Sequence, residues 1–184
     1  MIDPQNITKY DRTQEELEEL ALFAICVAGK RADLTAQKVD LFVQLLKAKH
    51  PDTTLFGGIY REGRQGVYGL LQQVRMGQYN RISDAFMAVS NVDMKCTGVV
   101  WLESAIGPKT ARFILLHSRP NQRYAVLDTH ILAWMRDQGV KAPKSTPPAG
   151  NRYNQLEQEF LRLIGDRDVA EVDLEIWRSK SKSK

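Results

Sequence analysis

Apolar side chains recur every three to four residues along almost the whole of this 184-residue chain. After residue 13, for example, Leu17, Leu20, Ala21 and Ala24 fall on one face of a helix. The alternating runs rich in Val, Ile and Thr that strands require do not occur in the sequence. The chain therefore predicts an all-α fold.

Residues that favour helix ends mark the first two helices. Residues 13–16, Thr-Gln-Glu-Glu, form the pattern of a capping box, and Gly29 ends the helix that follows. Asp33 is expected to cap a second helix, which ends at His50–Pro51 because proline disfavours helical backbone before it. Residues 51–64 are expected to form a loop that can contain a single helical turn at residues 53–56.

Helical periodicity continues along the rest of the chain. Further helices are expected over about residues 65–76, 79–90, 94–103, 108–117, 129–138, 153–164 and 169–177. Three prolines and a glycine make residues 140–150 an irregular connection. The last seven residues, 178–184, alternate Arg or Lys with Ser and are expected to form a basic, disordered tail.

Composition narrows the class of protein. Hydrophobic residues make up 43% of the chain, enough for the core of a single unit. The net charge of +4, from 26 Lys and Arg against 22 Asp and Glu, suits a nucleic-acid partner without requiring one. Cys26 and Cys96 stand in apolar helical surroundings and are expected to be thiols in a reducing compartment. The sequence has no membrane-spanning apolar run and no signal-peptide pattern, so we expect an intracellular protein of the cytoplasm or nucleoid.

Lys109 and Asp128 stand at the starts of two successive helices, nineteen residues apart (128 − 109). Pro108 fits the first helical position, where its missing N–H is harmless. Gly107 supplies the backbone freedom for a tight turn between two helices, so residues 94–118 are expected to form a helix-hairpin-helix. The N–H groups at the start of its second helix would face a DNA phosphate.

This region resembles the helix-hairpin-helix DNA glycosylases of the endonuclease III superfamily. The matching residues of the hairpin and of the aspartate segment are Gly107, Lys109, Thr110 and Ala111, then Val126, Asp128, Thr129, His130 and Ile131. Residues 28–33, with Gln37 and Lys38, and residues 76–80 are similar to two segments that lie earlier in the family's order. The resemblance covers about residues 15–140.

The resemblance implies a role for each matched residue. Lys109 would be the nucleophile that forms a Schiff base, and Asp128 the catalytic carboxylate. Lys30 and Gln78 would enter the gap that a flipped base leaves in the duplex. Further DNA contacts are implied at Arg31, Tyr79, Ala105, Gly107 and Thr110.

The chain also departs from the family pattern. Ala105 replaces the first glycine of the family's hairpin, and Gln78 stands where leucine is common in relatives. The four-cysteine iron–sulfur motif of many members is absent, because the chain has only two cysteines, so we expect no cofactor and no bound metal. These departures leave the identity of the excised base open.

The function implied by the resemblance is excision of a damaged or modified base from DNA, together with β-elimination at the abasic site. Asp128 would stabilise positive charge on the sugar and help to deprotonate Lys109, which attacks C1′ as an unprotonated amine. Burial and the positive end of its helix would both lower the pKa of Lys109. The expected partner is double-stranded DNA with an altered base or an abasic site, and we expect a monomer that does not bind membranes.

Simpler interpretations stay open at the same positions. Asp128 is also a favoured N-cap, and Lys109 could bind phosphate only. The alternatives are a monofunctional glycosylase, in which Asp128 activates water, and a non-catalytic DNA-binding helix-hairpin-helix protein. Trp101 is expected in the core. The implied fold has residues 30–120 in one lobe and residues 1–29 with 121–177 in the other, on the two sides of a DNA cleft.

Overall fold

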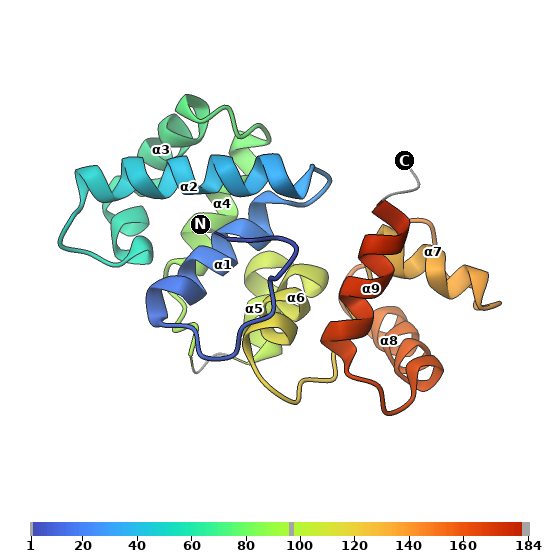
Figure 1. Ribbon diagram of the computed structural model, residues 1–184. Coiled ribbons are helices and arrows are strands. Elements are labelled where there is room, and N and C mark those ends of the chain that lie inside the picture. Colours follow the sequence, from blue (N-terminus) through green and yellow to red (C-terminus); the bar gives the residue numbers. More distant parts are fainter. Residues whose placement is uncertain (1, 96–97, 182–184) are drawn as a thin grey trace. The chain divides into compact units, whose positions relative to one another are not determined.

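The computed structural model of the protein describes residues 2–95 and 98–181 (Figure 1). Within these ranges the regular secondary structure is helical, so the all-α fold expected from the sequence is confirmed. The helices are α1 (Gln14–Cys26), α2 (Ala32–Lys49), α3 (Leu55–Gln73), α4 (Tyr79–Val89), α5 (Val99–Ile106), α6 (Pro108–Ser118), α7 (Thr129–Asp137), α8 (Asn151–Ile164) and α9 (Val169–Ser181).

The described residues divide into two compact units. The first contains residues 2–7 and 11–106 with α1 to α5, and the second contains residues 8–10 and 107–181 with α6 to α9. These units differ from the expected lobes at two helices, because α1 belongs to the first unit and α6 to the second. A division into lobes on the two sides of a DNA cleft stays a prediction.

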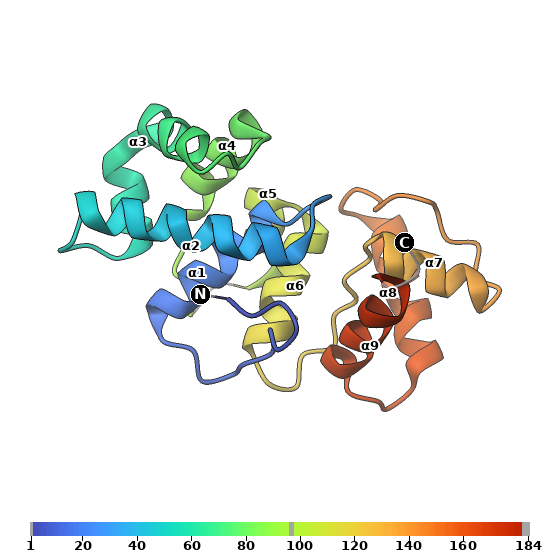
Figure 2. The ribbon, with the colours of Figure 1, turned by 45° about the horizontal axis from the view of Figure 1, so that its top comes forward.

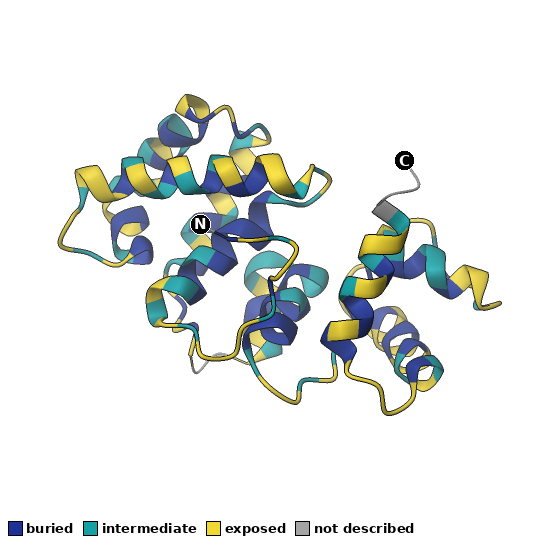
Figure 3. Cartoon of the chain, in the orientation of Figure 1, coloured by how far each residue is buried: buried dark blue, intermediate teal, exposed yellow. Residues whose placement is uncertain are grey.

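The first unit is organised around α1, which packs against α2, α3 and α4. The predicted capping box is confirmed at its start, where Thr13 accepts from the N–H of Glu16 and the Glu16 carboxylate accepts from the N–H of Thr13. Every residue from Leu20 to Cys26 is buried, so this half of α1 is surrounded by protein on all sides (Figure 3). Buried Glu18 accepts from the N–H of Phe56 at 3.0 Å, which satisfies a backbone donor at the start of α3.

The expectation of a loop over residues 51–64 is wrong, because α3 already begins at Leu55. Thr54 caps it by accepting from the N–H of Gly57, and the helical backbone is interrupted only at Gly63. Gly63 has φ 63° and ψ 174°, which glycine adopts without a steric penalty. Gly63 therefore joins two helical segments at a kink and does not lie in a loop.

Two further helix boundaries differ from the expectation. Asp33 does not cap α2: Arg31 occupies the N-cap, and Asp33 lies in the first turn and forms an exposed ion pair with Arg31 at 2.6 Å. The helix expected at 94–103 is observed at Val99–Ile106, and residues 96–97, with Cys96, lie outside the described residues. Trp101 of this helix is 71% exposed, so its expected place in the core is wrong.

The second unit has its own core, in which α9 lies against α7 and α8 (Figure 2) and also contacts α6. Its fully buried side chains include Leu127, Leu132, Met135, Tyr153 and Leu156. Residues 140–150 form the expected irregular connection between α7 and α8. Helix α9 continues to Ser181, which corrects the expected disorder for residues 178–181, and the rest of the expected tail lies outside the described residues.

Candidate active site

Asp128 is the N-cap residue of α7, as the sequence predicted. Its Oδ1 accepts hydrogen bonds from the N–H groups of His130 and Ile131, both at 2.8 Å. The chain reaches it through residues 125–127, which are buried and turn tightly, since the N–H of Asp128 donates to the carbonyl of Val126 at 2.6 Å. The carboxylate is therefore held in place by its own helix and by the segment before it.

The electrostatic surroundings of Asp128 favour its protonated form. Burial raises the pKa of the Asp128 carboxyl above its ordinary value of 3.8, and the nearby negative charge of Asp173 raises it further. The hydrogen bond from Ile131 and the positive charges of His130 and Lys109 act in the opposite direction. Net elevation of the pKa of a buried carboxyl is a common property of groups that take up protons in catalysis.

Lys109 is the second residue of α6, directly after Pro108 at the first helical position. Gly107 precedes the helix with φ 83° and ψ 161°, a backbone conformation that is essentially restricted to glycine. The first turn closes with a hydrogen bond from the N–H of Ala111 to the carbonyl of Gly107 at 3.1 Å. Lys109 thus lies partly buried at the positive end of a helix dipole, in the same unit as Asp128 and within electrostatic reach of its carboxylate.

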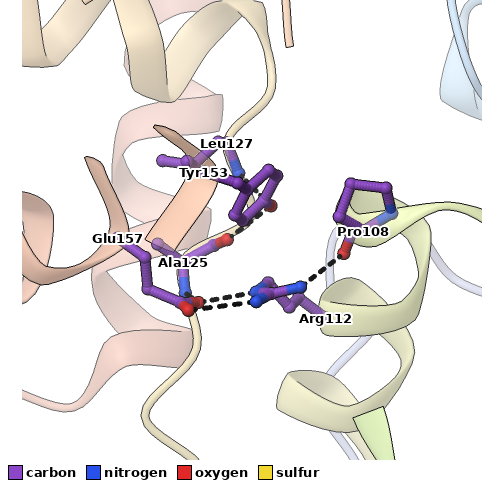
Figure 4. A network of polar contacts seen from close by, with 6 residues as sticks. All are labelled: Pro108, Arg112, Ala125, Leu127, Tyr153 and Glu157. Carbon is purple, nitrogen blue, oxygen red and sulfur yellow. Dashed lines mark hydrogen bonds and ion pairs between the residues drawn. The ribbon is translucent and has the colours of Figure 1, made fainter. Parts of the chain in front are cut away.

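A buried ion pair fixes the helix that carries Lys109 (Figure 4). Arg112 lies one turn further along α6 and donates to Glu157 of α8 through Nε at 2.7 Å and through Nη2 at 3.2 Å. The Arg112 side chain is 5% exposed and that of Glu157 is 9% exposed. A bidentate pair of this kind restrains both partners strongly.

The same network reaches the segment that leads to Asp128. Glu157 also accepts from the N–H of Ala125 at 2.8 Å, and the Tyr153 hydroxyl donates to the carbonyl of Ala125 at 2.9 Å and accepts from the N–H of Leu127 at 3.2 Å. The guanidinium of Arg112 stacks over the Tyr153 ring, 4.3 Å from its centre. Arg112, Glu157 and Tyr153 therefore connect the two elements that carry Lys109 and Asp128.

This network was not predicted from the sequence, although the sequence contains a signal for it. Tyr153, Leu156, Phe160 and Ile164 form the buried face of α8, and Glu157 lies on that same face. A carboxylate among apolar residues at helical spacing indicates a buried polar partner. The identity of that partner is not contained in the local pattern, because Arg112 is 45 residues away.

The residues expected to enter the duplex lie in the first unit. Gln78 precedes α4 with a left-handed backbone, φ 52°, and its Oε1 accepts from Nη2 of Arg81 at 2.6 Å and from Nε at 2.9 Å. The same Nη2 of Arg81 donates to the carbonyl of Ile25, at the end of α1, at 3.0 Å. Lys30 lies in the loop after α1, and its Nζ is buried without a hydrogen-bond partner among the described residues.

Arg81 is thus a common neighbour of Lys30 and Gln78. Burial lowers the pKa of the Lys30 ammonium, and the positive charges of Arg81 and Lys38 lower it further, against an opposing effect of Cys26. Arg81 therefore holds the Gln78 side chain and is an electrostatic neighbour of Lys30. The sequence analysis did not identify Arg81, because its role depends on contacts with two distant segments.

The other expected DNA-binding residues are divided between the two units. Arg31 is exposed in its ion pair, and Tyr79 begins α4 with its ring 5.5 Å from that of Tyr68. Ala105 lies near the end of α5 in the first unit. In the second unit Gly107 forms the turn before α6, whereas the side chain of Thr110 is buried, so a contact with DNA would come from its backbone.

Comparison with known proteins shows similarity of fold to solved structures. No protein-family model matches the sequence, and no curated protein matches it. The fold is similar to the crystal structure of the Methanocaldococcus jannaschii 8-oxoguanine DNA glycosylase, with a TM-score of 0.68 and 18% identity over 97% of this chain and 84% of that chain. It is also similar to the 8-oxoguanine glycosylase/lyase of the same organism in complex with a 15mer DNA containing 8-oxoguanine, with a TM-score of 0.64 and 16% identity over 94% and 84% of the two chains. The chain therefore has the fold of these helical DNA glycosylases.

Neither a membrane-spanning helix nor a cluster of metal ligands is found among the described residues. Among the described helices, none combines the length and the apolar character that crossing a bilayer requires. Across residues 2–95 and 98–181, His, Cys, Asp and Glu side chains do not gather in threes at a distance suited to a metal ion.

Proposed function

We propose that this protein is a DNA glycosylase that excises an altered base from duplex DNA and then cleaves the strand at the resulting abasic site. Lys109 is the nucleophile and Asp128 is the carboxylate that assists it. The observation that carries the proposal is their joint placement in the second unit, at the starts of α6 and α7, where the positive charge of Lys109 acts on the Asp128 carboxyl. The glycosylase fold of the structural relatives supports it.

The chemistry assigns each residue a defined step. Lys109 gives up a proton to the Asp128 carboxylate, and its Nζ lone pair forms a bond to C1′ of the flipped nucleotide. The bond between C1′ and the base nitrogen breaks, and its electron pair leaves with the base, which takes up the proton from Asp128. Asp128, ionised again, stabilises the positive charge on the sugar. The C1′–O4′ bond then breaks, a proton moves from Nζ to O4′, and the resulting Schiff base at Lys109 permits β-elimination of the 3′ phosphate.

Base excision requires that the nucleotide first leaves the helical stack. In the proposed complex Lys30 and Gln78 occupy the gap, and Arg81 keeps the Gln78 amide in a fixed orientation through its two hydrogen bonds. Arg31, Tyr79, Ala105, Gly107 and Thr110 provide contacts to the DNA backbone around the flipped nucleotide. The first base to test is 8-oxoguanine, because it is the base in the DNA complex of one structural relative.

The test is a panel of duplexes, each with one altered base or mismatch, assayed separately for base release and for strand nicking. The panel contains 8-oxoguanine, an oxidised pyrimidine, uracil and mismatched thymine. We expect release of at least one base by the unmodified protein and loss of release in Asp128→Asn. Strand nicking should disappear in Lys109→Gln, whereas base release that survives in this variant would indicate a monofunctional glycosylase with water as nucleophile. Binding of DNA without release of any base would indicate a non-catalytic DNA-binding protein and contradict the proposal.

A further inference from the structure

We propose that Arg81 makes Gln78 a hydrogen-bond donor only, and that Gln78 thereby selects duplexes by the acceptors of the base opposite the gap, with cytosine preferred most and guanine least. The inference rests on the proposed function, because it places Gln78 in the gap that the flipped base leaves. It concerns residues of the first unit only, and Arg81 lies outside the matched segment 76–80.

Two hydrogen bonds fix the side-chain amide of Gln78. Its Oε1 accepts from Nη2 of Arg81 at 2.6 Å and from Nε of Arg81 at 2.9 Å. A guanidinium has donors only, so the amide oxygen must face it, whereas the reverse orientation would place the amide N–H groups against those of Arg81. The orientation of the Gln78 amide therefore follows from the chemistry of its partner.

Arg81 is held in turn by the core of the first unit. Its Nη2 also donates to the carbonyl of Ile25 at 3.0 Å, in the last turn of α1. The last four carbonyls of a helix have no partner within the helix, and they lie at its negative end, where a positive charge is favourable. Ile25 is buried and α4 packs against α1, so the Gln78 amide is tied to a buried helix through Arg81.

The amino group of Gln78 is left for the DNA. Gln78 is exposed, directly before α4, and within the described residues its Nε2 makes no hydrogen bond. An unrestrained glutamine can turn either its oxygen or its amino group toward a base. With the oxygen engaged by Arg81, Gln78 offers N–H donors only, and the ammonium of Lys30, the other residue proposed to enter the gap, also has donors only.

The four bases differ in what they present to such donors. The Watson–Crick edge of an unpaired cytosine has two neighbouring acceptors, whereas thymine has two acceptors on the two sides of an N–H, and adenine has one. Guanine has a single acceptor beside two donors, so donors would face donors. The expected order of binding is therefore cytosine, then thymine and adenine, then guanine, with a difference of about tenfold or more between the first and the last.

The test measures binding to duplexes that contain a tetrahydrofuran analogue of an abasic site opposite cytosine, thymine, adenine or guanine. Such a duplex has an unpaired base and nothing to excise, so affinity is measured without catalysis. The unmodified protein should bind the cytosine duplex about tenfold more tightly than the guanine duplex. Gln78→Glu should reverse this order, because its carboxylate keeps the contact with Arg81 and turns an acceptor toward the base. A role of Gln78 in folding alone would not reverse the order.

Two further variants should remove the selection without reversing it. Gln78→Met has a side chain of similar length with no amide, and Arg81→Leu leaves the Gln78 amide without its restraint. Both should bind the cytosine and guanine duplexes with nearly equal affinity. Arg61→Leu is the matched control, because it removes the same charge from an exposed position of the same unit, and it should leave the ratio of the two affinities unchanged.

Equal binding of the four duplexes by the unmodified protein would overturn the inference. An unchanged order in Gln78→Glu, or an unchanged ratio in folded Arg81→Leu, would overturn it as well. Because Gln78 is exposed, its two variants should fold and decide the matter even if Arg81→Leu does not fold. Failure of the unmodified protein to release any altered base would contradict the proposed function, while the order of the four affinities would still decide the role of Arg81.

Discussion

Arg112 forms a bidentate, almost completely buried ion pair with Glu157, with 2.7 Å between Nε and Oε1. Because Arg112 lies one turn after Lys109, and Glu157 also accepts from the N–H of Ala125, this pair holds α6 against the segment that ends at Asp128. The relative position of Lys109 and Asp128 therefore depends on residues that do not take part in the proposed chemistry.

Removal of the Glu157 charge should destabilise the protein strongly. Glu157→Gln leaves the buried Arg112 guanidinium without its counter-charge, which typically costs about 3–5 kcal/mol. Chemical denaturation measures the free energy of unfolding. The control is Glu159→Gln, at an exposed position of the same helix, which should change it by less than about 0.5 kcal/mol. Equal stability of the two variants would show that the ion pair does not restrain the fold.

Replacement of Asp128 by Asn should abolish activity and stabilise the fold at neutral pH. The pKa of Asp128 is raised in the folded protein by burial and by Asp173, so its contribution to stability is greatest below the ordinary pKa of 3.8 and is lost as pH rises through the folded value. Asn keeps the N-cap hydrogen bonds, whereas Asp128→Ala loses them at a cost of about 1 kcal/mol. Thermal unfolding at several pH values checks this. The stability of Asp128→Asn relative to the unmodified protein should increase with pH, and a relative stability that decreases with pH would contradict the raised pKa of Asp128.

The turn at Gly107 permits a test of backbone strain without steric overlap. Gly107 has a positive φ of 83°, and a Cβ added there meets no atom within 4 Å. Gly107→Ala should therefore destabilise the protein by about 1–3 kcal/mol through backbone conformation alone. Gly69, inside α3, also has open space around an added Cβ. Gly69→Ala should stabilise by about 0.5–1 kcal/mol, and effects of the same sign in both variants would refute this explanation.

Lys30 and Gln78, which we propose to fill the gap left by the flipped base, should affect base excision more than adduct formation at an abasic site. Gln78→Ala and Lys30→Met should slow the release of a paired altered base by about tenfold or more, because extrusion of a stacked base costs a few kcal/mol. An abasic duplex has no base to extrude, so adduct formation with it should change little. Parallel rate measurements on the two duplexes provide the comparison, with exposed Gln72→Ala as the control. Equal losses on both duplexes would indicate a general defect in binding.

The all-α fold and the two helix starts that carry Lys109 and Asp128 could be predicted from local pattern. Pro108 at the first turn of α6 and Asp128 as the cap of α7 are signals confined to a few residues, and the structure has both helices where they were expected. The helix over residues 55–62 was missed because its start depends on Thr54 and on buried Glu18, which comes from a distant helix. Local composition favoured a loop there, but contacts with distant residues stabilise a helix.

The supporting residues of the site could not be predicted for the same reason. Arg112 and Glu157 are 45 positions apart, and Arg81 and Ile25 are 56 apart, so each pair is visible only after the chain has folded. Trp101 shows the opposite error, because an aromatic residue on a short helix was expected in the core and is 71% exposed. Periodicity identified helices well, but it did not indicate which buried positions carry paired charges.

The central claim is that Lys109 forms a covalent bond with the sugar of the processed nucleotide. Borohydride reduction during reaction with an abasic duplex converts a Schiff base into a stable adduct, and peptide mass spectrometry locates it. The account predicts a protein–DNA adduct whose modified residue is Lys109, reduced strongly in Asp128→Asn and absent in Lys109→Gln. An adduct that forms equally in Lys109→Gln, or that maps to another lysine, would contradict it.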